Sequence, residues 1–485
     1  MSQSDVAASK ERHARVAIDL GAESCRVSLL RWHQDGAEIS EVHRIPNAPV
    51  VRSGSHHWPL GDILAGLEEG LRKAAEVANG PIASIAVDGW AVDYVRLDGS
   101  GKPVGDPFCY RDERTITSKE RADRILPPSE AFRRTGAQPL RINTVYQLLA
   151  DEAEVAHAPW TCLPEYVLHW LGAPRVAEYT NATHTGLVDP ATGSWAWDVF
   201  DALGIPIEAV PRIVAPGTRL GRLRGPIAEL PAFRETELIA PACHDTASAI
   251  AGIPADLDST AYICSGTWSL VGTLVVRPIT TAEALAARYT NQGAAGGGFC
   301  FHTNVNGMWL LKQCMEAWSA AGRAWTIAEL VKRAAEYTDR VGILNVDAEP
   351  LLLASEMPQR INRELERTGQ PLIPDVAGNE PMFARLIFQS LAERYSEALA
   401  ALEEMLDRKL HQVHVIGGAS RNQLLADLAS QRSGIPVDCG HPESSTIGNF
   451  AVQLAASEST GGPLTRARVR DWAEGLCRTE LQPCR

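Results

Sequence analysis

Three polar residues in succession, His244-Asp245-Thr246, follow a short apolar segment at 238–242 and precede a helical pattern. A carboxylate in this place can lie on the floor of a cleft and accept the proton of an attacking hydroxyl group. Asp and Thr are also ordinary helix N-caps, so a plain cap is the alternative for this segment. The pattern makes Asp245 a candidate general base.

A turn of small residues separates two short strand patterns near the start of the chain, in the segment Asp19-Leu-Gly-Ala-Glu-Ser-Cys-Arg26. Gly21 permits a tight turn in which backbone N–H groups and Ser24 can surround phosphate oxygens, and Arg26 adds positive charge. Asp19 suits a magnesium ion held through water, because magnesium keeps several waters and takes few carboxylates. A simple hairpin turn is the alternative.

A second turn of small residues, Ser265-Gly266-Thr267, stands between two strand patterns in the second half of the chain. Alone, this tripeptide is weak evidence for a ligand. Its place is equivalent to that of the first turn, and a triphosphate needs donors on both sides of a closing cleft. The two turns together predict a nucleotide site between two halves of the molecule.

A pair of glycines, Gly417-Gly418, follows a strand pattern late in the chain. Without side chains, they let the backbone approach a flat ring, and Asn422 can bond the polar edge of a base. A glycine turn before a helix N-cap is an equally good interpretation. The segment is a candidate for the nucleotide base.

An aromatic ring and two carboxylates stand together in Asp88-Gly-Trp90-Ala91-Val-Asp93, at the end of a strand pattern. Such a set can stack on the apolar face of a sugar and bond its hydroxyl groups. Trp90 can equally pack in the core. The segment is a candidate sugar site.

The elements that must hold these residues repeat along the chain. Strand, turn and strand patterns at 15–32 and 260–276 begin the two halves, and helical spacing covers 62–78 and 381–407. This echo indicates an internal duplication with a cleft between the halves.

Shorter elements complete the expected arrangement. We expect a strand at 82–87, a second hairpin that turns at 98–101, and a helix that starts near residue 246 with Asp or Thr near its N-cap. The predicted domains are an N-terminal lobe at 14–253, a C-terminal lobe at 254–460 and a final segment at 461–485.

Composition sets limits on the function. A chain of 485 residues exceeds the usual size of one hydrophobic core, which predicts two domains. The net charge of −13 opposes nonspecific binding to nucleic acid or anionic lipid. With no apolar run long enough to cross a bilayer, we expect a cytoplasmic protein, either a monomer or a homodimer. The ten cysteines form no C-x-x-C pair, so we expect mostly buried thiols.

Taken together, these segments resemble the FGGY carbohydrate kinases over nearly the whole chain, from about residue 15 to about residue 456. Within that family they are most similar to the kinases of L-rhamnulose. The motifs that carry the resemblance are Asp19-Leu-Gly-Ala-Glu-Ser-Cys-Arg, Glu41-Val-His-Arg-Ile, Asp88-Gly-Trp-Ala-Val-Asp, Tyr110-Arg-Asp-Glu-Arg-Thr, Asn143-Thr-Val-Tyr-Gln-Leu, Tyr179-Thr-Asn-Ala-Thr, His244-Asp-Thr-Ala-Ser-Ala and Ser265-Gly-Thr-Trp-Ser-Leu.

The resemblance implies an α/β fold of the actin-like ATPase (ribonuclease H-like) type, with two duplicated lobes around a nucleotide cleft. It implies that ATP, with Mg2+, phosphorylates L-rhamnulose on O1, and that the family's base falls on Asp245. Residues expected to contact the sugar are Trp90, Ala91, Asp93, His244, Thr246 and Asn304. Residues expected to contact ATP are Ala22, Glu23, Ser24, Cys25, Arg26, Gly266, Thr267, Lys312, Gly417, Gly418 and Asn422.

Two positions depart from the family pattern. Ala91 replaces a glycine whose backbone would approach the sugar, and Lys312 replaces a glutamine on the ATP side. A kinase for another ketose, such as L-fuculose or xylulose, is therefore an alternative. A nucleotide-binding regulator on the same fold is an alternative of another class, but it would have no chemical reason to assemble Asp245 with the residues of a sugar pocket.

Overall fold

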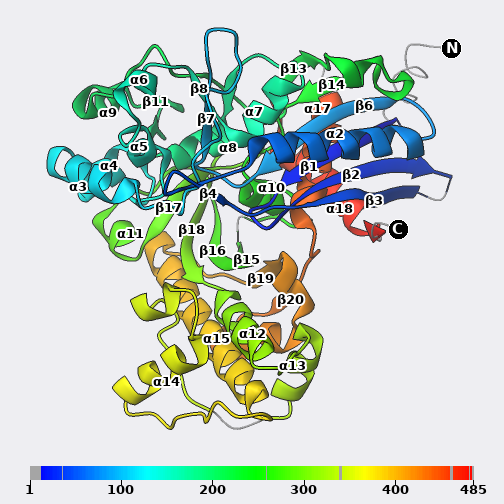
Figure 1. The fold of residues 1–485 in the computed structure, drawn as a ribbon. Helices are drawn as coiled ribbons and strands as arrows, with labels where there is room; N and C mark the ends of the chain where they lie inside the picture. The colour runs from blue at the N-terminus through cyan, green and yellow to red at the C-terminus, as the bar shows by residue number, and fades with distance from the viewer. Residues whose placement is uncertain are drawn as a thin grey trace.

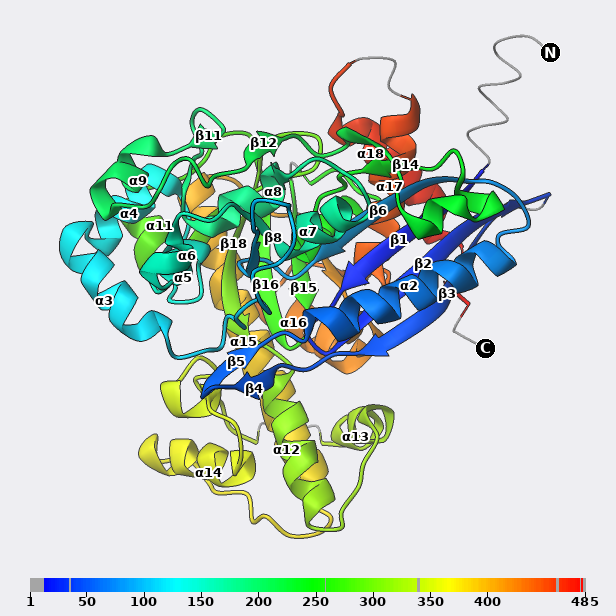
Figure 2. The same cartoon turned by 45° about the horizontal axis from the view of Figure 1, so that its top comes forward.

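The computed structural model describes residues 13–34, 36–257, 259–337, 341–458, 462–479 and 481–482. Two large sheets with helices against them form two lobes (Figure 1). The long helix α15 (Glu380–Leu406) runs through the second lobe, whereas α2 (Leu60–Val77) lies along the first sheet (Figure 2). Both helices match the helical spacing predicted from the sequence.

The first lobe is built on a seven-stranded sheet in the order β13-β14-β6-β1-β2-β3-β21. Its strands are β1 (Ala14–Leu20), β2 (Ser24–His33), β3 (Gly36–Pro46), β6 (Ile82–Gly89), β13 (Arg219–Arg222), β14 (Glu237–Ile239) and β21 (Leu481–Gln482). The predicted hairpin of β1 and β2 is confirmed, and β6 runs parallel to β1 with Asp19 opposite Asp88. The carboxyl ends of two buried parallel strands therefore place two acids at one edge of the sheet.

The second sheet has six strands in the order β17-β18-β16-β15-β19-β20. Its strands are β15 (Thr260–Ser265), β16 (Trp268–Val275), β17 (Tyr289–Gly293), β18 (Phe299–Asn306), β19 (Gln412–Ile416) and β20 (Val437–Cys439). β15 pairs antiparallel with β16 and parallel with β19, which repeats the relation of β1 to β2 and β6. The predicted duplication is thus confirmed, and the turns after β1 and β15 occupy equivalent places.

Helices and short strands fill the rest of the chain. The remaining helices are α3 (Thr115–Ile125), α4 (Pro128–Thr135), α5 (Thr144–Leu148), α6 (Ala153–Ala156), α7 (Leu163–Trp170), α8 (Tyr179–Ala182), α9 (Trp197–Leu203), α10 (Asp245–Ala251), α11 (Ala282–Ala286), α12 (Trp309–Ala320), α13 (Ile327–Ala334), α14 (Met357–Arg367), α16 (Gln423–Ser433), α17 (Ser444–Glu458) and α18 (Arg466–Cys477). The short strands are β4 (Val50–Arg52), β5 (Ser55–His57), β7 (Tyr94–Arg96), β8 (Trp160–Cys162), β9 (Val176–Glu178), β10 (Val188–Asp189), β11 (Ser194–Trp195) and β12 (Arg212–Val214).

The last part of the chain returns to the first lobe. Ile447 and Phe450 of α17 share a buried apolar cluster with Ala17 and Leu30 of the first sheet. Figure 1 shows α17 and α18, in orange and red, beside that sheet. The predicted second lobe, 254–460, therefore includes a helix, α17, that packs on the sheet of the first lobe.

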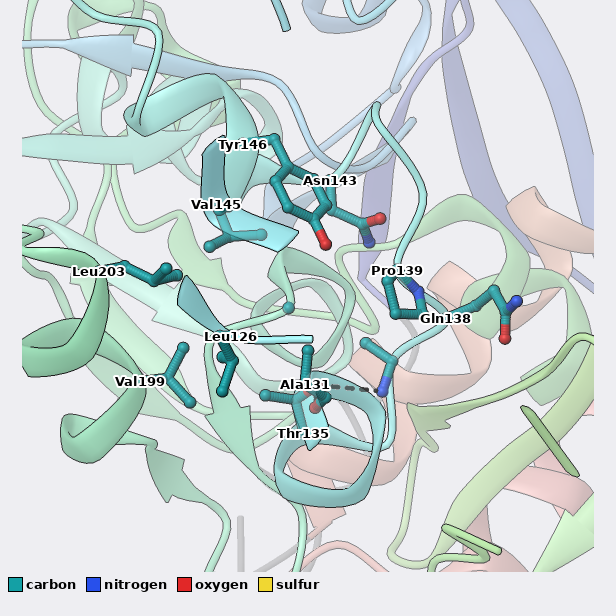
Figure 3. A pocket seen from close by; sticks show the side chains of 13 residues that line it. Leu126, Ala131, Thr135, Gln138, Pro139, Asn143, Val145, Tyr146, Val199 and Leu203 are labelled. Atoms are coloured by element: carbon teal, nitrogen blue, oxygen red, sulfur yellow. Dashed lines mark hydrogen bonds between the residues drawn. The ribbon is translucent and has the colours of Figure 1, made fainter. Parts of the chain in front are cut away.

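A helical region between β7 and β12 extends the first lobe and has a core of its own. A small pocket of about 20 Å³ lies within this region, between α3, α4, α5 and α9 (Figure 3). Leu126, Val145, Tyr146 and Val199 line the pocket. None of the residues predicted to carry chemistry lines this pocket, so the candidate site lies elsewhere.

The turn predicted at 98–101 is present, and the hairpin around it is short. The N–H of Gly101 donates to the carbonyl oxygen of Asp98 at 3.0 Å, the N–H of Val104 donates to that of Arg96 at 2.9 Å, and an antiparallel bridge joins Leu97 to Pro103. β7 also pairs with β8, which was not predicted. Asp245 and Thr246 are the first two residues of α10, next to the N-cap as predicted, and the N-cap itself is His244, whose Nδ1 accepts from the N–H of Thr246 at 3.2 Å.

Most described cysteines are buried, as predicted: Cys25, Cys109, Cys162, Cys243, Cys300 and Cys314. Cys264 and Cys477 are partly buried, Cys439 is exposed, and Cys484 lies outside the described residues. Among the described helices, none has the length and apolar character needed to cross a membrane.

Candidate active site

A cavity of about 530 Å³ lies between the two lobes. The turns after β1 and β15, the start of α10, the Gly417-Gly418 turn and the start of α17 all contribute to its lining. The predicted site residues among its lining are Asp19, Ala22, Glu23, Ser24, Arg26, Trp90, Ala91, His244, Asp245, Thr246, Gly266, Thr267, Gly417 and Gly418. The fold thus brings together segments that are up to 426 positions apart in the chain, as the hydrogen bond between Asp19 and Ser445 shows.

Asp245 is the first residue of α10 and its side chain is 37% exposed. Its Oδ1 lies 2.8 Å from His244 Nδ1 and accepts from the backbone N–H of Thr246 at 2.5 Å. Within the described ranges the hydrogen bonds of this carboxylate all involve Oδ1, which leaves Oδ2 to the cavity. A carboxylate with one oxygen fixed and the other accessible can accept a proton from a bound hydroxyl group.

A buried network supports the segment before α10. The carboxylate of Glu178 accepts from the backbone N–H of Cys243 at 2.8 Å and from Thr180 Oγ1 at 2.5 Å. Thr180 Oγ1 in turn accepts from the backbone N–H of His244 at 3.2 Å. Burial raises the pKa of Glu178 to about 8, and these hydrogen bonds oppose that rise. The motif Tyr179-Thr-Asn-Ala-Thr therefore supports the backbone segment that carries the candidate base.

His184 lies on the same side of the cavity as His244. Their rings meet edge to face, with centroids 4.8 Å apart. Burial lowers the pKa of His184 well below its ordinary value, and the neighbouring His244 and His302 lower it further. His184 therefore adds a neutral polar ring beside Asp245 at neutral pH.

Acids gather where β1 and β6 end. Arg26 forms ion pairs with both Asp19 and Glu443, and Ser445 Oγ donates to Asp19 at 2.9 Å. Burial raises the pKa of Asp19; Arg26 opposes this rise, and the nearby Asp245 adds to it. The region carries more negative charge than Arg26 alone offsets.

Asp88 lies behind Asp19 and is fully buried. Its Oδ2 accepts from Asn449 Nδ2 of α17 at 2.5 Å, whereas its buried Oδ1 has no hydrogen-bond partner among the described residues. Burial raises the pKa of Asp88 well above its ordinary value, and the charge of Asp19 raises it further.

This acid-rich edge fits a cation. No group of three or more His, Cys, Asp or Glu side chains within the described ranges could hold a metal ion directly. Such an arrangement suits magnesium, which keeps several of its waters and often takes one or two carboxylates. Asp19 lines the cavity and could hold the ion through water, with the charge of Asp88 behind it.

The turns on the second lobe bring backbone to the cavity. Gly417 has φ of 81°, and a Cβ atom there would lie 2.9 Å from the carbonyl oxygen of Ser265. The Gly417 turn therefore packs directly on the turn after β15, which a larger residue would prevent. A Cβ at Gly418 would meet nothing within 4 Å, so Gly418 borders open space on the cavity side.

A second cavity, of about 450 Å³, adjoins the first at Thr267, which lines both. Apolar side chains of α12 and of the segment before α13 dominate its lining: Met308, Leu311, Met315, Trp325 and Ile327. Lys312 also lines it and forms an ion pair with Glu23 of the first lobe. No ligand role was predicted from the sequence for the apolar residues of this cavity.

Trp90 and Ala91 form part of an apolar side of the main cavity. Asp93 does not line it: the residue is fully buried, and its Oδ2 accepts from Trp90 Nε1 at 2.9 Å. Burial raises the pKa of Asp93 to about 6. In this structure Asp93 supports, from behind, the side of the cavity that contains Trp90.

Other predicted residues also lie away from the main cavity. Cys25 is buried in the core of the first lobe. Asn304, on β18, is paired in register with Leu270, which lines the cavity. Asn422 Oδ1 accepts from the N–H of Leu425 at 3.1 Å, so Asn422 caps α16, which is the alternative that its sequence left open.

Several cavity residues had no role in the sequence analysis: Arg44, Val92, Tyr110, Arg111, Ile142, His184, Cys264, Trp268, Glu443 and Ser445. Five of them, Arg44, Val92, Tyr110, Arg111 and Trp268, stand inside the motifs that carry the family resemblance, so those motifs are the signal that could have indicated them. Glu443 and Ser445 come from a loop and a helix start that fold back from the second lobe. No local pattern marks such residues.

Two duplicated lobes, a cleft lined by paired turns, and a half-exposed carboxylate at its floor define a nucleotide-dependent phosphotransferase of the actin-like ATPase type. The chain belongs to the FGGY family of carbohydrate kinases: residues 14–252 match the family's N-terminal domain, and residues 261–457 match its C-terminal domain. It is therefore a sugar kinase that uses ATP.

Two relatives at the level of sequence are rhamnulokinases. The chain is 33% identical to the rhamnulokinase of Bacteroides thetaiotaomicron over 450 residues, which cover 92% of this chain and 91% of that protein. It is 34% identical to the rhamnulokinase of Pectobacterium carotovorum over 451 residues, which cover 91% of this chain and 88% of that protein.

Solved structures support the fold. A ligand-bound xylulose kinase from Lactobacillus acidophilus superposes with a TM-score of 0.76 at 16% identity, covering 96% of this chain and 92% of that one. A Plasmodium falciparum glycerol kinase with ADP gives a TM-score of 0.75 at 14% identity, covering 97% and 94%. These likenesses establish the predicted actin-like architecture.

Proposed function

We propose that this kinase transfers the γ-phosphate of ATP to O1 of L-rhamnulose, giving L-rhamnulose 1-phosphate and ADP, with Asp245 as the general base. The observation that carries the proposal is the carboxylate of Asp245, which lines the cavity with one oxygen held by the His244 ring and the Thr246 backbone. The sequence similarity to two rhamnulokinases over about nine tenths of the chain supports the choice of sugar.

Asp245 would accept the proton of the O1 hydroxyl group as that oxygen attacks the γ-phosphate in line. His244 and Thr246, which hold Asp245, would contact the sugar as well. Trp90 and Ala91 would cover its apolar face, and Asn304 would approach from the second lobe. Closure of the lobes would exclude water, which would otherwise compete for the phosphoryl group.

The two turns would receive the phosphates. Ala22, Glu23, Ser24 and Arg26 line the cavity from the first lobe, and Gly266, Thr267, Gly417 and Gly418 line it from the second. The apolar cavity beyond Thr267 has the character needed for the adenine ring. When bound near Asp19, a magnesium ion would supply positive charge to the phosphate oxygens. This chain's own contribution is to place donors on both sides of the cleft.

The test is ADP release by the purified protein with ATP and magnesium across a panel of acceptors. The panel contains L-rhamnulose, L-fuculose, D-xylulose, L-xylulose, D-ribulose and glycerol. We expect L-rhamnulose to give the highest kcat/KM, and NMR of the product to place the phosphate on O1. Phosphorylation at another oxygen would refute the proposed chemistry of the sugar site.

Another ketose is the second candidate, and Ala91 is the observation that favours it. Its methyl group lies in the cavity lining where the family pattern has glycine, so the pocket is narrower there. A higher kcat/KM for L-fuculose or a xylulose in the same panel would keep Asp245 as the base and change the substrate. The Ala91→Gly variant would then show whether this methyl group sets the preference.

A further inference from the structure

Val92 has an unusual backbone conformation in the wall of the main cavity. Its φ is 71°, in the left-handed region that β-branched residues rarely occupy. Seven non-glycine residues with positive φ occur in the described ranges, and among them Val92 alone is β-branched and alone lines the cavity. Strain of this kind persists only where the surroundings enforce it.

Two buried side chains of α5 hold the Val92 backbone. Thr144 Oγ1 donates to the carbonyl oxygen of Val92 at 2.8 Å, and Gln147 Nε2 donates to the same oxygen at 3.2 Å. Thr144 is fully buried and Gln147 is 1% exposed. On other positions of α5, Val145 and Tyr146 point toward the small pocket of Figure 3. Thr144 and Gln147, on one face of this short helix, therefore both bond the Val92 carbonyl oxygen.

The same α5 face reaches Asp93. Gln147 Nε2 also lies 2.9 Å from Asp93 Oδ1, while Asp93 Oδ2 accepts from Trp58 Nε1 at 2.6 Å, from Trp90 Nε1 at 2.9 Å and from the backbone N–H of Tyr110 at 3.2 Å. Four donors thus hold this carboxylate, three of them on Oδ2 and one on Oδ1. Asp93 is fully buried and does not line the cavity, so it acts by connecting α5 to two residues of the cavity lining, Trp90 and Tyr110.

The residues so held form one apolar surface. Trp90, Ala91, Val92 and Ile142 all line the cavity, and we call these four residues the apolar wall. A wall without donors or acceptors favours a methyl group over a hydroxymethyl group, because a buried hydroxyl group without a partner is costly. The preference depends on the wall remaining in place, since a wall that moves can admit water or a polar group.

We infer that Thr144 and Gln147, together with Asp93, are positioning residues that hold the apolar wall and so make the enzyme prefer a ketose with a terminal methyl group. The inference rests on the proposed function and names the part of the fold that enforces its choice of sugar. Thr144 and Gln147 do not line the cavity, so they act through Val92.

The experiment compares Thr144→Val with Thr236→Val in the full-length protein. Thr236 is also buried, and its Oγ1 donates to the carbonyl oxygen of Ile82 at 2.6 Å, at the opposite end of β6 from the cavity. Both variants lose one buried hydroxyl bond and keep their shape. The two sugars are L-rhamnulose and L-fructose, which differ only in a terminal methyl or hydroxymethyl group.

For Thr144→Val we expect KM for L-rhamnulose to rise about tenfold with kcat changed by less than about threefold, which is the effect of one lost anchoring bond on substrate binding. The ratio of kcat/KM for L-rhamnulose to that for L-fructose should fall about as much. Thr144→Ser, which restores the hydroxyl group, should recover both values. Thr236→Val should lose thermal stability to a similar extent and keep the wild-type KM and sugar ratio.

Equal sugar ratios in Thr144→Val, Thr236→Val and the wild type would overturn the inference while leaving the proposed function intact. A wild-type protein that phosphorylates neither sugar would refute the proposed function itself. If Thr144→Val does not fold, Gln147→Leu gives the same comparison, because it removes the second donor to Val92.

Discussion

The proposed sugar side and the proposed nucleotide side of the cavity are built in different ways. On the sugar side, two fully buried carboxylates, Asp93 and Glu178, gather donors from several segments and fix side chains and backbone behind the cavity surface. On the nucleotide side, glycines bring the backbone itself to the surface, and the ion pair between Lys312 and Glu23 lies exposed between the lobes.

The difference follows from what each ligand requires. Distinguishing one sugar from another needs a wall that does not move, because a methylene or hydroxyl difference is worth little unless the pocket is rigid. Phosphates need close N–H groups and can be bound by backbone that any sequence could supply, provided that glycine allows the approach. Substitution of the candidate base Asp245 should therefore change the kinetic parameters most. Smaller changes should follow for the Gly417-Gly418 turn, then for the buried Asp93, and finally for the exposed ion pair of Lys312.

The largest effect is expected for Asp245→Asn. The amide keeps the size of the side chain but cannot accept the proton, so kcat should fall about 10³-fold, within the range for a general base. ADP binding, measured by isothermal titration calorimetry, should remain close to wild type. A kcat within about tenfold of the wild type would show that another group takes the proton.

A smaller loss is expected for Gly418→Ala. Gly418 does not have positive φ, and a Cβ there meets no protein atom within 4 Å, so the variant should fold normally. Its methyl group would occupy space on the cavity side, and KM for ATP should rise about tenfold, the cost of a steric displacement of about 1–3 kcal/mol.

The matched control is Gly475→Ala in α18, where φ is also ordinary and space is open. It should leave KM for ATP unchanged. If Gly418→Ala matches this control in KM for ATP, the nucleotide does not approach the Gly417-Gly418 turn.

For Asp93 and its buried donors we expect opposite effects of pH on stability and on sugar binding. Because burial raises the pKa of Asp93 to about 6, the folded state favours its protonated form. Its contribution to stability is fully present below the unfolded pKa of about 4 and is lost as pH rises through about 6. The protonated acid, however, cannot accept from all four donors, so KM for the sugar should rise several-fold between pH 7 and pH 5.

A comparison of the wild type with Asp93→Asn isolates the effect of this carboxyl group, because the other buried acids are present in both proteins. As pH falls from 7 to 5, the Tm of the wild type should increase relative to that of the variant. The KM of the variant should be high at pH 7 and show little further change. Parallel curves of Tm and of KM for the two proteins would contradict the assigned role of Asp93.

The smallest effect is expected for Lys312→Gln. The side chains of Lys312 and Glu23 are 41% and 58% exposed, so their ion pair is screened by solvent and contributes little. We expect KM for ATP to change by about two- to threefold at low salt, with the difference disappearing near 1 M salt. Lys409→Gln, which removes an exposed ion pair with Glu403, should leave KM for ATP unchanged. A tenfold change that persists at high salt would indicate a direct bond from Lys312 to the nucleotide.

The sequence predicted the parts of the molecule that depend on local patterns. The hairpin after Asp19, its repeat at Ser265-Gly266-Thr267 and the helix at 381–407 were predicted because alternation, small turn residues and helical spacing are recorded in adjacent residues. The turn predicted at 98–101 is also present, whereas the pairing of β7 with β8 was not predicted, because β8 lies about 60 residues further along the chain.

For the site, the sequence alone determined which kinds of groups meet: a candidate base at Asp245, two phosphate turns and an aromatic sugar face. Only the tertiary structure decided how each group is used. Asp93, selected as a sugar ligand, is buried behind the wall, where four donors hold its carboxylate. Asn422 caps a helix, and Glu443 and Ser445 return from the far end of the chain to meet Arg26 and Asp19. A side chain's role depends on which donors, acceptors and charges surround it, and contacts between distant segments supply most of these.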